Sequence, residues 1–258
     1  MRVYACHSGG DRSDLATFDP FDKNVGTKVY CPYFFYLVEH PEGRVLFDTG
    51  LHRQILTDPA GRIGEAMGAF PIEMNEGGDV LGQLEKLGLA AGDVDAVIQS
   101  HLHFDHAGGL EFVKHADVYV QSAELDAARN PPVYQQDLYN PADFEHDLNW
   151  KPLEGDHDVF GDGTLRIISA PGHSPGHQAI YVEFEDRRPL VLMGDATYSV
   201  EKMRQRRLSA VVWNADATVS TWERLEEIER DTGAELRCTH EVAFEGQVPI
   251  APDAYWGP

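Results

Sequence analysis

Residues 101–106 (HLHFDH) place four strong metal-binding side chains within six positions, and this run constrains the chain more than any other feature. The apolar segment 96–100 that precedes it is predicted to be a strand. His101 and His103 then point to the same side and can reach one ion, because side chains alternate along an extended chain. The small residues that follow (AGG) permit a turn that aims Asp105 and His106 at a neighbouring point. Solvated or core histidines are the alternative, but so dense a cluster predicts a metal site.

Three further candidate ligands follow later predicted strands. His173 lies in the segment APGHSPGH, Asp195 lies in LMGDATY, and His240 comes after the last strand. A carboxylate at a strand end can bridge two cations, with one oxygen on each. We therefore predict two ion sites joined by Asp195, with the ligands His101, His103 and His173 for the first and Asp105, His106 and His240 for the second.

Imidazole and carboxylate ligands favour zinc, although manganese, iron or cobalt also fit such a set. Two ions about 3.5–4 Å apart can share a hydroxide that acts as the nucleophile. Asp48, at the end of an early strand, is predicted to orient one ligand histidine, with a plain turn residue as the alternative. His177 is expected to support its loop by hydrogen bonding. Cys238 is a further possible ligand, although a buried free thiol near a strand end explains it as well.

Strands and helices alternate along the chain without a linker, which predicts one α/β domain over residues 1–258 with two sheets covered by helices. Residues 49–79 have the character of a long ordered loop with short helical pieces, and residues 130–153 that of an insertion. The predicted strands are 2–6, 29–38, 44–48, 96–100, 118–121, 165–169, 178–184, 189–193 and 235–239. The predicted helices are 80–89, 123–129 and 219–231.

The formal net charge of −22 argues against a nucleic-acid partner, because such binding depends on Lys and Arg neutralising phosphates. An anionic membrane surface would also repel the chain, and no apolar stretch is long enough for a membrane helix. The start of the sequence does not have the pattern of a secretory signal. Three widely spaced cysteines do not form a disulfide framework, so we expect a cytoplasmic protein.

These ligand segments resemble those of the metallo-β-lactamase superfamily, whose signature is H-x-H-x-D-H. HLHFDHAGG, APGHSPGHQ, GDATY and His240 match the superfamily's segments in order and approximate spacing. The resemblance implies an αββα four-layer sandwich. Within the superfamily the chain is most similar to the N-acyl-homoserine lactone lactonases, because Tyr198 follows Asp195 by three residues. One departure is Thr239-His240-Glu241, where the family usually has Gly-His-Asp.

The resemblance implies a di-zinc hydrolase that opens the lactone ring of N-acyl-homoserine lactones, which are quorum-sensing signals, by attack of a metal-bridging hydroxide. Tyr198 would stabilise the oxyanion, and Asp105 would carry the proton to the leaving alkoxide. A plain core aromatic is the alternative for Tyr198. Hydrolases of γ-butyrolactone or pyridoxolactone share the pattern. A glyoxalase II-like thioester hydrolase also remains open, although no Lys or Arg follows His240. A non-catalytic metal-binding protein would bind metal without turnover.

A small-molecule lactone needs an apolar groove for its acyl chain. We expect this groove to use aromatic and methionine side chains from loops near the metals and from the 130–153 insertion, with ordinary packing as the alternative for each one. The same apolar surface could instead form a homodimer interface. The candidates are Met67, Phe70, Met74, Phe104, Tyr134, Tyr139, Phe144 and Trp150.

Overall fold

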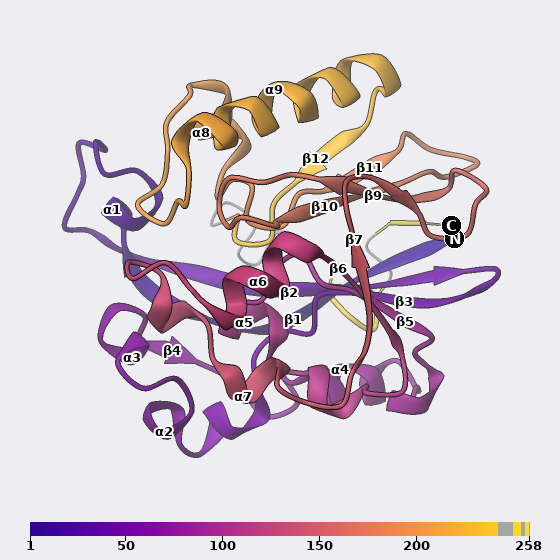
Figure 1. The fold of residues 1–258 in the computed structure, drawn as a ribbon, viewed down its shortest axis with the longest axis horizontal. Coiled ribbons are helices and arrows are strands. Elements are labelled where there is room, and N and C mark those ends of the chain that lie inside the picture. Colours follow the sequence, from indigo (N-terminus) through magenta and orange to yellow (C-terminus); the bar gives the residue numbers. More distant parts are fainter. Residues whose placement is uncertain (242–249, 254–255, 258) are drawn as a thin grey trace.

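Two β-sheets lie at the centre of the computed structural model, which describes residues 1–241, 250–253 and 256–257 (Figure 1). The first sheet has the strand order β4-β1-β2-β3-β5-β6-β7 and the second has the order β12-β11-β10-β9-β8. The first is built from β1 (Arg2–Asp14), β2 (Lys28–His40), β3 (Gly43–Phe47), β4 (Ile72–Glu73), β5 (Ala96–Ile98), β6 (Asp117–Gln121) and β7 (Asn149–Leu153). The second is built from β8 (His157–Asp158), β9 (Leu165–Ser169), β10 (Gln178–Val182), β11 (Leu190–Leu192) and β12 (Glu235–Arg237).

Helices cover the outer faces of both sheets. Those with α-helical geometry are α1 (Leu15–Phe18), α2 (Pro59–Ile63), α3 (Ala66–Ala69), α4 (Val80–Lys86), α5 (Phe104–Ala107), α6 (Ser122–Arg129), α7 (Pro141–Phe144), α8 (Val200–Arg204) and α9 (Ala215–Thr232). Short 3-10 helices lie at η1 (Arg53–Leu56), η2 (Ala91–Asp93), η3 (Leu110–Phe112) and η4 (Gln136–Leu138). Within the described residues, none of these helices combines the length and the hydropathy that crossing a bilayer requires.

Three apolar clusters hold the layers together. Between the sheets, Phe47 of β3 shares a fully buried cluster with Ile180 of β10 and Leu192 of β11. The outer face of the first sheet packs against α4, α6 and α7, and the outer face of the second packs against α8 and α9, where Trp222 is the largest buried side chain. Helices therefore lie on both sides of the paired sheets (Figure 1), which confirms the predicted αββα sandwich.

Strand direction brings the predicted ligand loops together. β3 and β5 run parallel, so Asp48 and the 99–106 segment leave the first sheet at the same edge, and Asp48 N donates to Ile98 O at 3.0 Å. β11 and β12 also run parallel, which places Asp195 and His240 at one edge of the second sheet. The loop that carries His173 joins the antiparallel strands β9 and β10.

Most predicted elements are confirmed, but the insertion over residues 130–153 is wrong in part. Its last five residues form β7, an edge strand that pairs parallel with β6 and that tolerates Pro152 because edge positions need fewer ladder hydrogen bonds. β1 extends beyond residue 6 to Asp14, and α9 begins at Ala215, capped by the Asn214 side chain. A single domain over residues 1–258 stays a prediction, since some residues lie outside the described part.

Candidate metal centre

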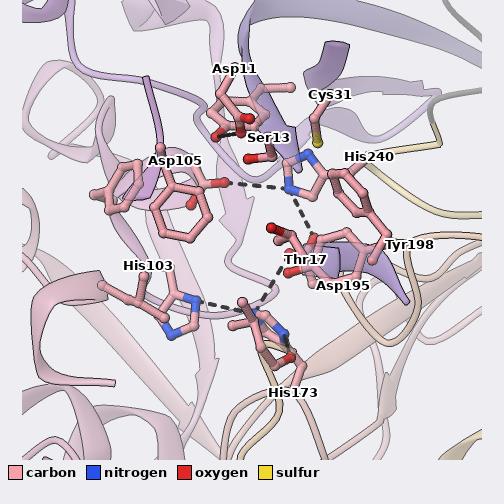
Figure 2. Close-up of a pocket in the computed structure, with 16 residues that line it drawn as sticks. Asp11, Ser13, Thr17, Cys31, His103, Asp105, His173, Asp195, Tyr198 and His240 are labelled. Atoms are coloured by element: carbon pink, nitrogen blue, oxygen red, sulfur yellow. Dashed lines mark hydrogen bonds and ion pairs between the residues drawn. The ribbon is translucent and has the colours of Figure 1, made fainter. Parts of the chain in front are cut away.

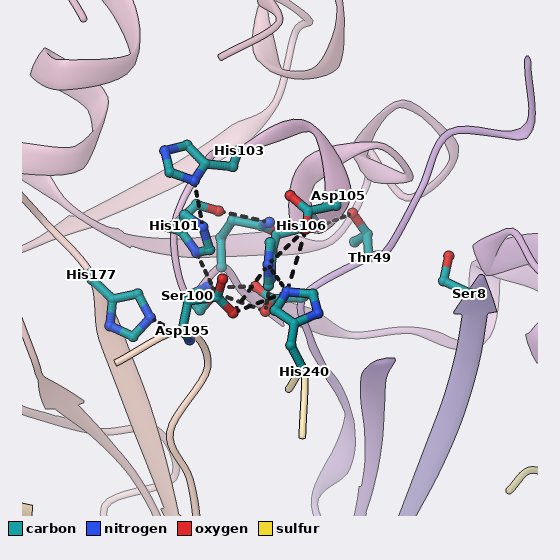
Figure 3. A network of polar contacts seen from close by, with 12 residues as sticks. Ser8, Thr49, Ser100, His101, His103, Asp105, His106, His177, Asp195 and His240 are labelled. Carbon is teal, nitrogen blue, oxygen red and sulfur yellow. Dashed lines mark hydrogen bonds and ion pairs between the residues drawn. The ribbon is translucent and has the colours of Figure 1, made fainter. Parts of the chain in front are cut away.

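The HLHFDH run begins three residues after β5 ends at Ile98. Figure 3 shows its four polar side chains, His101, His103, Asp105 and His106, close together. His103 is the N-cap residue of α5, and Asp105 and His106 lie within this short helix, with the His106 ring 4.1 Å from the His101 ring between centroids. The two glycines after α5 serve close packing rather than a special backbone angle. A Cβ on Gly108 would lie 2.3 Å from His52 N, and one on Gly109 would lie 2.7 Å from Thr49 O.

His101, His103 and His173 form the first cluster. His101 Nε2 lies 3.0 Å from His103 Nδ1 and 3.2 Å from His173 Nε2, while His103 Nδ1 lies 3.1 Å from His173 Nε2. Asp195 Oδ2 is 3.6 Å from His173 Nε2. Burial lowers the pKa of all three imidazoles, so they are neutral and present lone pairs to one another.

Asp105, His106 and His240 form the second cluster. His106 Nε2 lies 3.2 Å from His240 Nε2, and Asp105 Oδ2 lies 3.5 Å and 3.4 Å from these two nitrogens. Asp195 Oδ1 approaches the same nitrogens at 3.4 Å and 3.2 Å. Burial disfavours a charged His106, but the adjacent carboxylates outweigh burial and raise its pKa to about 10. The carboxylates of Asp105 and Asp195 therefore place negative charge around the imidazoles of His106 and His240.

The donor atoms of both clusters fit tetrahedral zinc. Bonds of about 2.0–2.1 Å to a tetrahedral ion separate neighbouring donor atoms by about 3.3 Å, and the contacts above span 3.0–3.6 Å. Asp195 gives one oxygen to each cluster, and its Oδ1 is buried without a hydrogen bond of good geometry. Groups of three donors that could hold an ion occur in each cluster and, through Asp195, between them. All seven predicted ligands are therefore brought together.

Backbone carbonyls orient two of the histidines. His173 Nδ1 donates to Val211 O at 3.2 Å, and His240 Nδ1 donates to Pro32 O at 2.9 Å. In each ring this contact assigns the proton to Nδ1 and leaves Nε2 pointing into the site. Such outer contacts are typical of metal-binding histidines.

Asp48 orients a third histidine, which confirms its predicted contact. Its Oδ2 accepts from His106 Nδ1 at 2.8 Å and from Ser100 Oγ at 2.7 Å, while its Oδ1 accepts from Ser100 N at 2.6 Å. Ser100 Oγ also lies 2.9 Å from His101 Nδ1, so one carboxylate connects both clusters. Asp48 has a φ of 65°, a strained conformation that its three hydrogen bonds hold in place.

His177 and Cys238 are used elsewhere. His177 Nδ1 donates to Ala170 O at 3.1 Å and its Nε2 accepts from Asp195 N at 3.0 Å, which confirms that His177 supports its loop. The buried thiol of Cys238 contacts Glu241 Oε2 at 3.2 Å and belongs to none of the donor groups found among the described residues.

Glu124 connects the two histidine loops, although no sequence pattern predicted it. This fully buried carboxylate accepts from Leu102 N and Tyr139 O–H through Oε1, at 3.0 Å and 3.1 Å. Through Oε2 it accepts from Ser174 Oγ and Gly176 N, at 2.6 Å and 3.0 Å. A glutamate on a helix normally faces water, so no local signal distinguishes this one.

Tyr198 faces both clusters across the adjoining pocket (Figure 2). Its ring stacks on His240 with centroids 5.6 Å apart and meets the His173 ring edge-on at 6.0 Å. Burial and the charges of Asp195 and Asp105 raise its pKa well above the usual value, so its hydroxyl keeps its proton and can donate.

The rest of this pocket includes part of the expected apolar groove. Phe70 and Phe104 line it, as expected. Phe18, Leu138 and Val211 line it as well and were not among the predicted groove residues. Met67 and Met74 pack in the apolar cluster next to the pocket. The four aromatics from the 130–153 segment do not line it: Tyr139, Phe144 and Trp150 pack in the core, and Tyr134 is exposed.

Comparison with known proteins agrees with this geometry. Residues 30–240 match the metallo-beta-lactamase superfamily. The chain is 31% identical to the N-acyl homoserine lactonase AttM of Azorhizobium caulinodans, over 99% of this chain and 98% of that protein. It is 28% identical to the N-acyl homoserine lactonase AiiA of Bacillus thuringiensis subsp. kurstaki, over 88% of each chain.

A solved structure is similar over almost the whole length. It is an N-acyl homoserine lactone hydrolase with the product N-hexanoyl-L-homoserine bound at its catalytic metal centre. The TM-score is 0.88 with 27% sequence identity, and the match covers 98% of both chains. The chain therefore belongs to the metallo-β-lactamase superfamily and, within it, to the family of N-acyl homoserine lactonases, which are metal-dependent hydrolases.

Proposed function

We propose that this chain hydrolyses the lactone ring of N-acyl homoserine lactones to give N-acyl homoserines. The observation that carries the proposal is the convergence of two donor clusters that share Asp195 beside one pocket that also contains Tyr198. The related hydrolase with N-hexanoyl-L-homoserine at its metal centre supports the same reaction.

The proposed cofactors are two divalent ions, with zinc as the first choice. His101, His103 and His173 would hold one ion, Asp105, His106 and His240 the other, and Asp195 both. When bound, such ions polarise a carbonyl and lower the pKa of water to about 7, which supplies a hydroxide nucleophile at neutral pH. The donor distances and the charge of Asp105 and Asp195 support this assignment.

Tyr198 is proposed to bind the carbonyl oxygen of the lactone. Its protonated hydroxyl can donate a hydrogen bond that strengthens as negative charge develops on this oxygen. The Tyr198 ring meets His173 of the first cluster edge-on at 6.0 Å and stacks on His240 of the second cluster at 5.6 Å. An oxyanion that accepts from the phenol would therefore lie next to the first cluster.

Asp105 is proposed to carry a proton to the leaving alkoxide. Its side chain is 14% exposed and lines the pocket, so it is the most accessible carboxylate of the two clusters. Burial would raise the pKa of Asp105, but the charges of His106 and His240 outweigh burial and lower this pKa. Asp105 is therefore deprotonated at the start of the reaction and can accept a proton.

We also propose a cytoplasmic location for this chain. Cys6, Cys31 and Cys238 are free thiols in the structure, and a reducing cytoplasm remains our prediction for this chain. The predicted partner is a small-molecule lactone, and a homodimer remains a prediction that the oligomeric state in solution would test.

One panel of substrates tests the proposed function. Purified chain loaded with zinc should hydrolyse N-hexanoyl homoserine lactone, and Tyr198→Phe should reduce kcat/KM about 100- to 1,000-fold with unchanged metal content. Tyr119→Phe, in β6 and outside this pocket, is the matched control. Turnover of γ-butyrolactone or a glutathione thioester in preference to the acyl homoserine lactone would replace the proposal with the corresponding alternative.

A further inference from the structure

Four polar side chains face the pocket from β1 and β2: Asp11, Ser13, Cys31 and Tyr33. Asp11 and Ser13 are only 2% and 1% exposed. In Figure 2 both lie at the side of the pocket occupied by Asp105 and His240, remote from His103 and His173. These residues form a polar wall, and none of their side chains belongs to the donor groups found among the described residues.

Strand geometry points these side chains inward. β1 and β2 are antiparallel, and Asp11 pairs with Cys31, so the two side chains share one face of the sheet. Arg12 between Asp11 and Ser13 is exposed, as alternation requires. An irregularity between His7 and Gly9 shifts the register of β1 just before this segment, and such bulges redirect side chains.

The polar wall has unused hydrogen-bonding capacity. The Tyr33 hydroxyl donates to Asp11 Oδ2 at 2.5 Å and fixes the carboxyl. Asp11 Oδ1 and Ser13 Oγ are buried without a hydrogen-bond partner in the described part of the chain. Burial raises the pKa of Asp11, and the hydroxyls of Ser13 and Tyr33 beside the carboxyl lower it. Buried polar atoms are normally paired, so two unpaired atoms facing one pocket point to a ligand.

We propose that Asp11 and Ser13 bind a hydrogen-bond donor of the lactone substrate, an amide N–H or a hydroxyl. The chain would therefore select lactones that carry such a donor over lactones that lack it. This inference rests on the proposed function and narrows its substrate class. A carboxylate oxygen only accepts hydrogen bonds, whereas a serine hydroxyl can also donate, so the group must present a donor to Asp11.

The location suits recognition next to the reacting ring. Tyr33, whose hydroxyl holds Asp11, packs its ring edge-on against His240 with centroids 4.8 Å apart, and Asp11 lines the same pocket as Asp105. A substrate positioned at the second cluster would therefore present its substituents to this wall, while Phe70 and Leu138 remain available for apolar groups. A site built to bind an N–H or O–H rejects an analogue without it, because the buried acceptor then stays unpaired.

Three matched substrates test the proposal on the zinc-loaded full chain. N-hexanoyl homoserine lactone carries an amide N–H, its ester isostere carries oxygen in place of that N–H, and the N-(3-hydroxyhexanoyl) compound adds a hydroxyl. We expect kcat/KM to be about 10- to 100-fold higher for a donor-bearing lactone than for the ester isostere. A preference that appears with the amide identifies the N–H as the donor. A preference that appears only with the 3-hydroxy compound identifies the hydroxyl.

Asp11→Asn and Ser13→Ala provide the decisive comparison. Asp11→Asn should remove most of the preference by lowering kcat/KM for the donor-bearing lactone and leaving the ester isostere unchanged. Ser13→Ala should reduce the preference less and keeps the proposal testable if Asp11→Asn does not fold. Ser220→Ala, on the exposed surface of α9, is the matched control. Metal content and Tm are measured for every variant.

Three outcomes overturn the inference. The first is equal turnover of all three lactones by the original chain. The second is an equal loss on all three in Asp11→Asn and Ser13→Ala, which would assign both residues a purely structural role. In the third, no lactone is hydrolysed at all, and the proposed function then fails together with the inference.

Discussion

Replacing Glu124 by glutamine tests whether one buried carboxylate holds the two histidine loops in place. Each carboxylate oxygen accepts one backbone N–H and one hydroxyl, with Leu102 N and Gly176 N as the backbone donors. Glutamine keeps the shape but turns one oxygen into an NH2 group. The hydroxyl hydrogens of Ser174 and Tyr139 can rotate away from this NH2 group, whereas a backbone N–H cannot. Either orientation of the amide therefore leaves one backbone N–H unpaired.

The expected loss follows from these contacts. Hydrogen bonds to a charged group contribute about 1.5–3 kcal/mol each, and Glu124→Gln removes two of them. Burying a neutral amide rather than a carboxylate offsets part of this loss. We therefore expect the free energy of unfolding to fall by about 2–4 kcal/mol.

Urea denaturation of the metal-free protein measures this change without a contribution from bound ions. Glu227→Gln on the exposed side of α9 is the matched control, because its contact with Arg230 is a surface ion pair worth about 0.5 kcal/mol or less. Zinc affinity of Glu124→Gln should also fall, since the segments that carry His101 and His173 are no longer tied. Unchanged stability and unchanged zinc affinity would refute the positioning role.

Further predictions concern three other positions. Asp48→Asn should weaken zinc binding about 10- to 100-fold in chelator competition, because it disturbs the contact that orients His106. Asp19 has a lowered pKa, mainly through its hydrogen bonds with an arginine, so its contribution to stability is present above about pH 4 and lost as pH falls further. Asp19→Asn should therefore lower Tm at about pH 7 more than at about pH 3. Gly176→Ala should lower the unfolding free energy by about 1–3 kcal/mol, because its Cβ would lie 2.2 Å from Glu124 N.

Each of these has a contradicting result. Wild-type zinc affinity in Asp48→Asn would remove Asp48 from the site. An equal Tm loss at both pH values would show that the hydrogen bonds of Asp19 do not lower the pKa of its carboxyl. An unchanged denaturation midpoint in Gly176→Ala would mean that the α6 backbone moves aside without a loss of stability. Gly92→Ala, whose Cβ meets nothing within 4 Å, is the control.

The ligands could be predicted from sequence because each follows a strand and belongs to a short run with few other uses. His101 and His103 needed only side-chain alternation, and Asp195 needed only its place at a strand end. Their spatial convergence depends on parallel pairing of β3 with β5 and of β11 with β12, which local patterns do not contain.

Residues whose orientation depends on tertiary packing could not be predicted. Asp11 and Ser13 lie beyond the point where glycines interrupt the apolar pattern, and only pairing with β2 shows that β1 continues there. Glu124 has an ordinary helical context, and its burial is decided by the loops that fold over α6. β7 was missed because its sequence, NWKPL, has a proline and no regular apolar alternation.

The metal content of the purified chain tests the central claim most directly. After saturation with zinc and removal of unbound ions on a desalting column, mass spectrometry of the elements should find about two zinc ions per folded chain. A folded chain that retains none would contradict the assignment of His101, His103, Asp105, His106, His173, Asp195 and His240 as ligands. A single retained ion would contradict the assignment of two ion sites joined by Asp195.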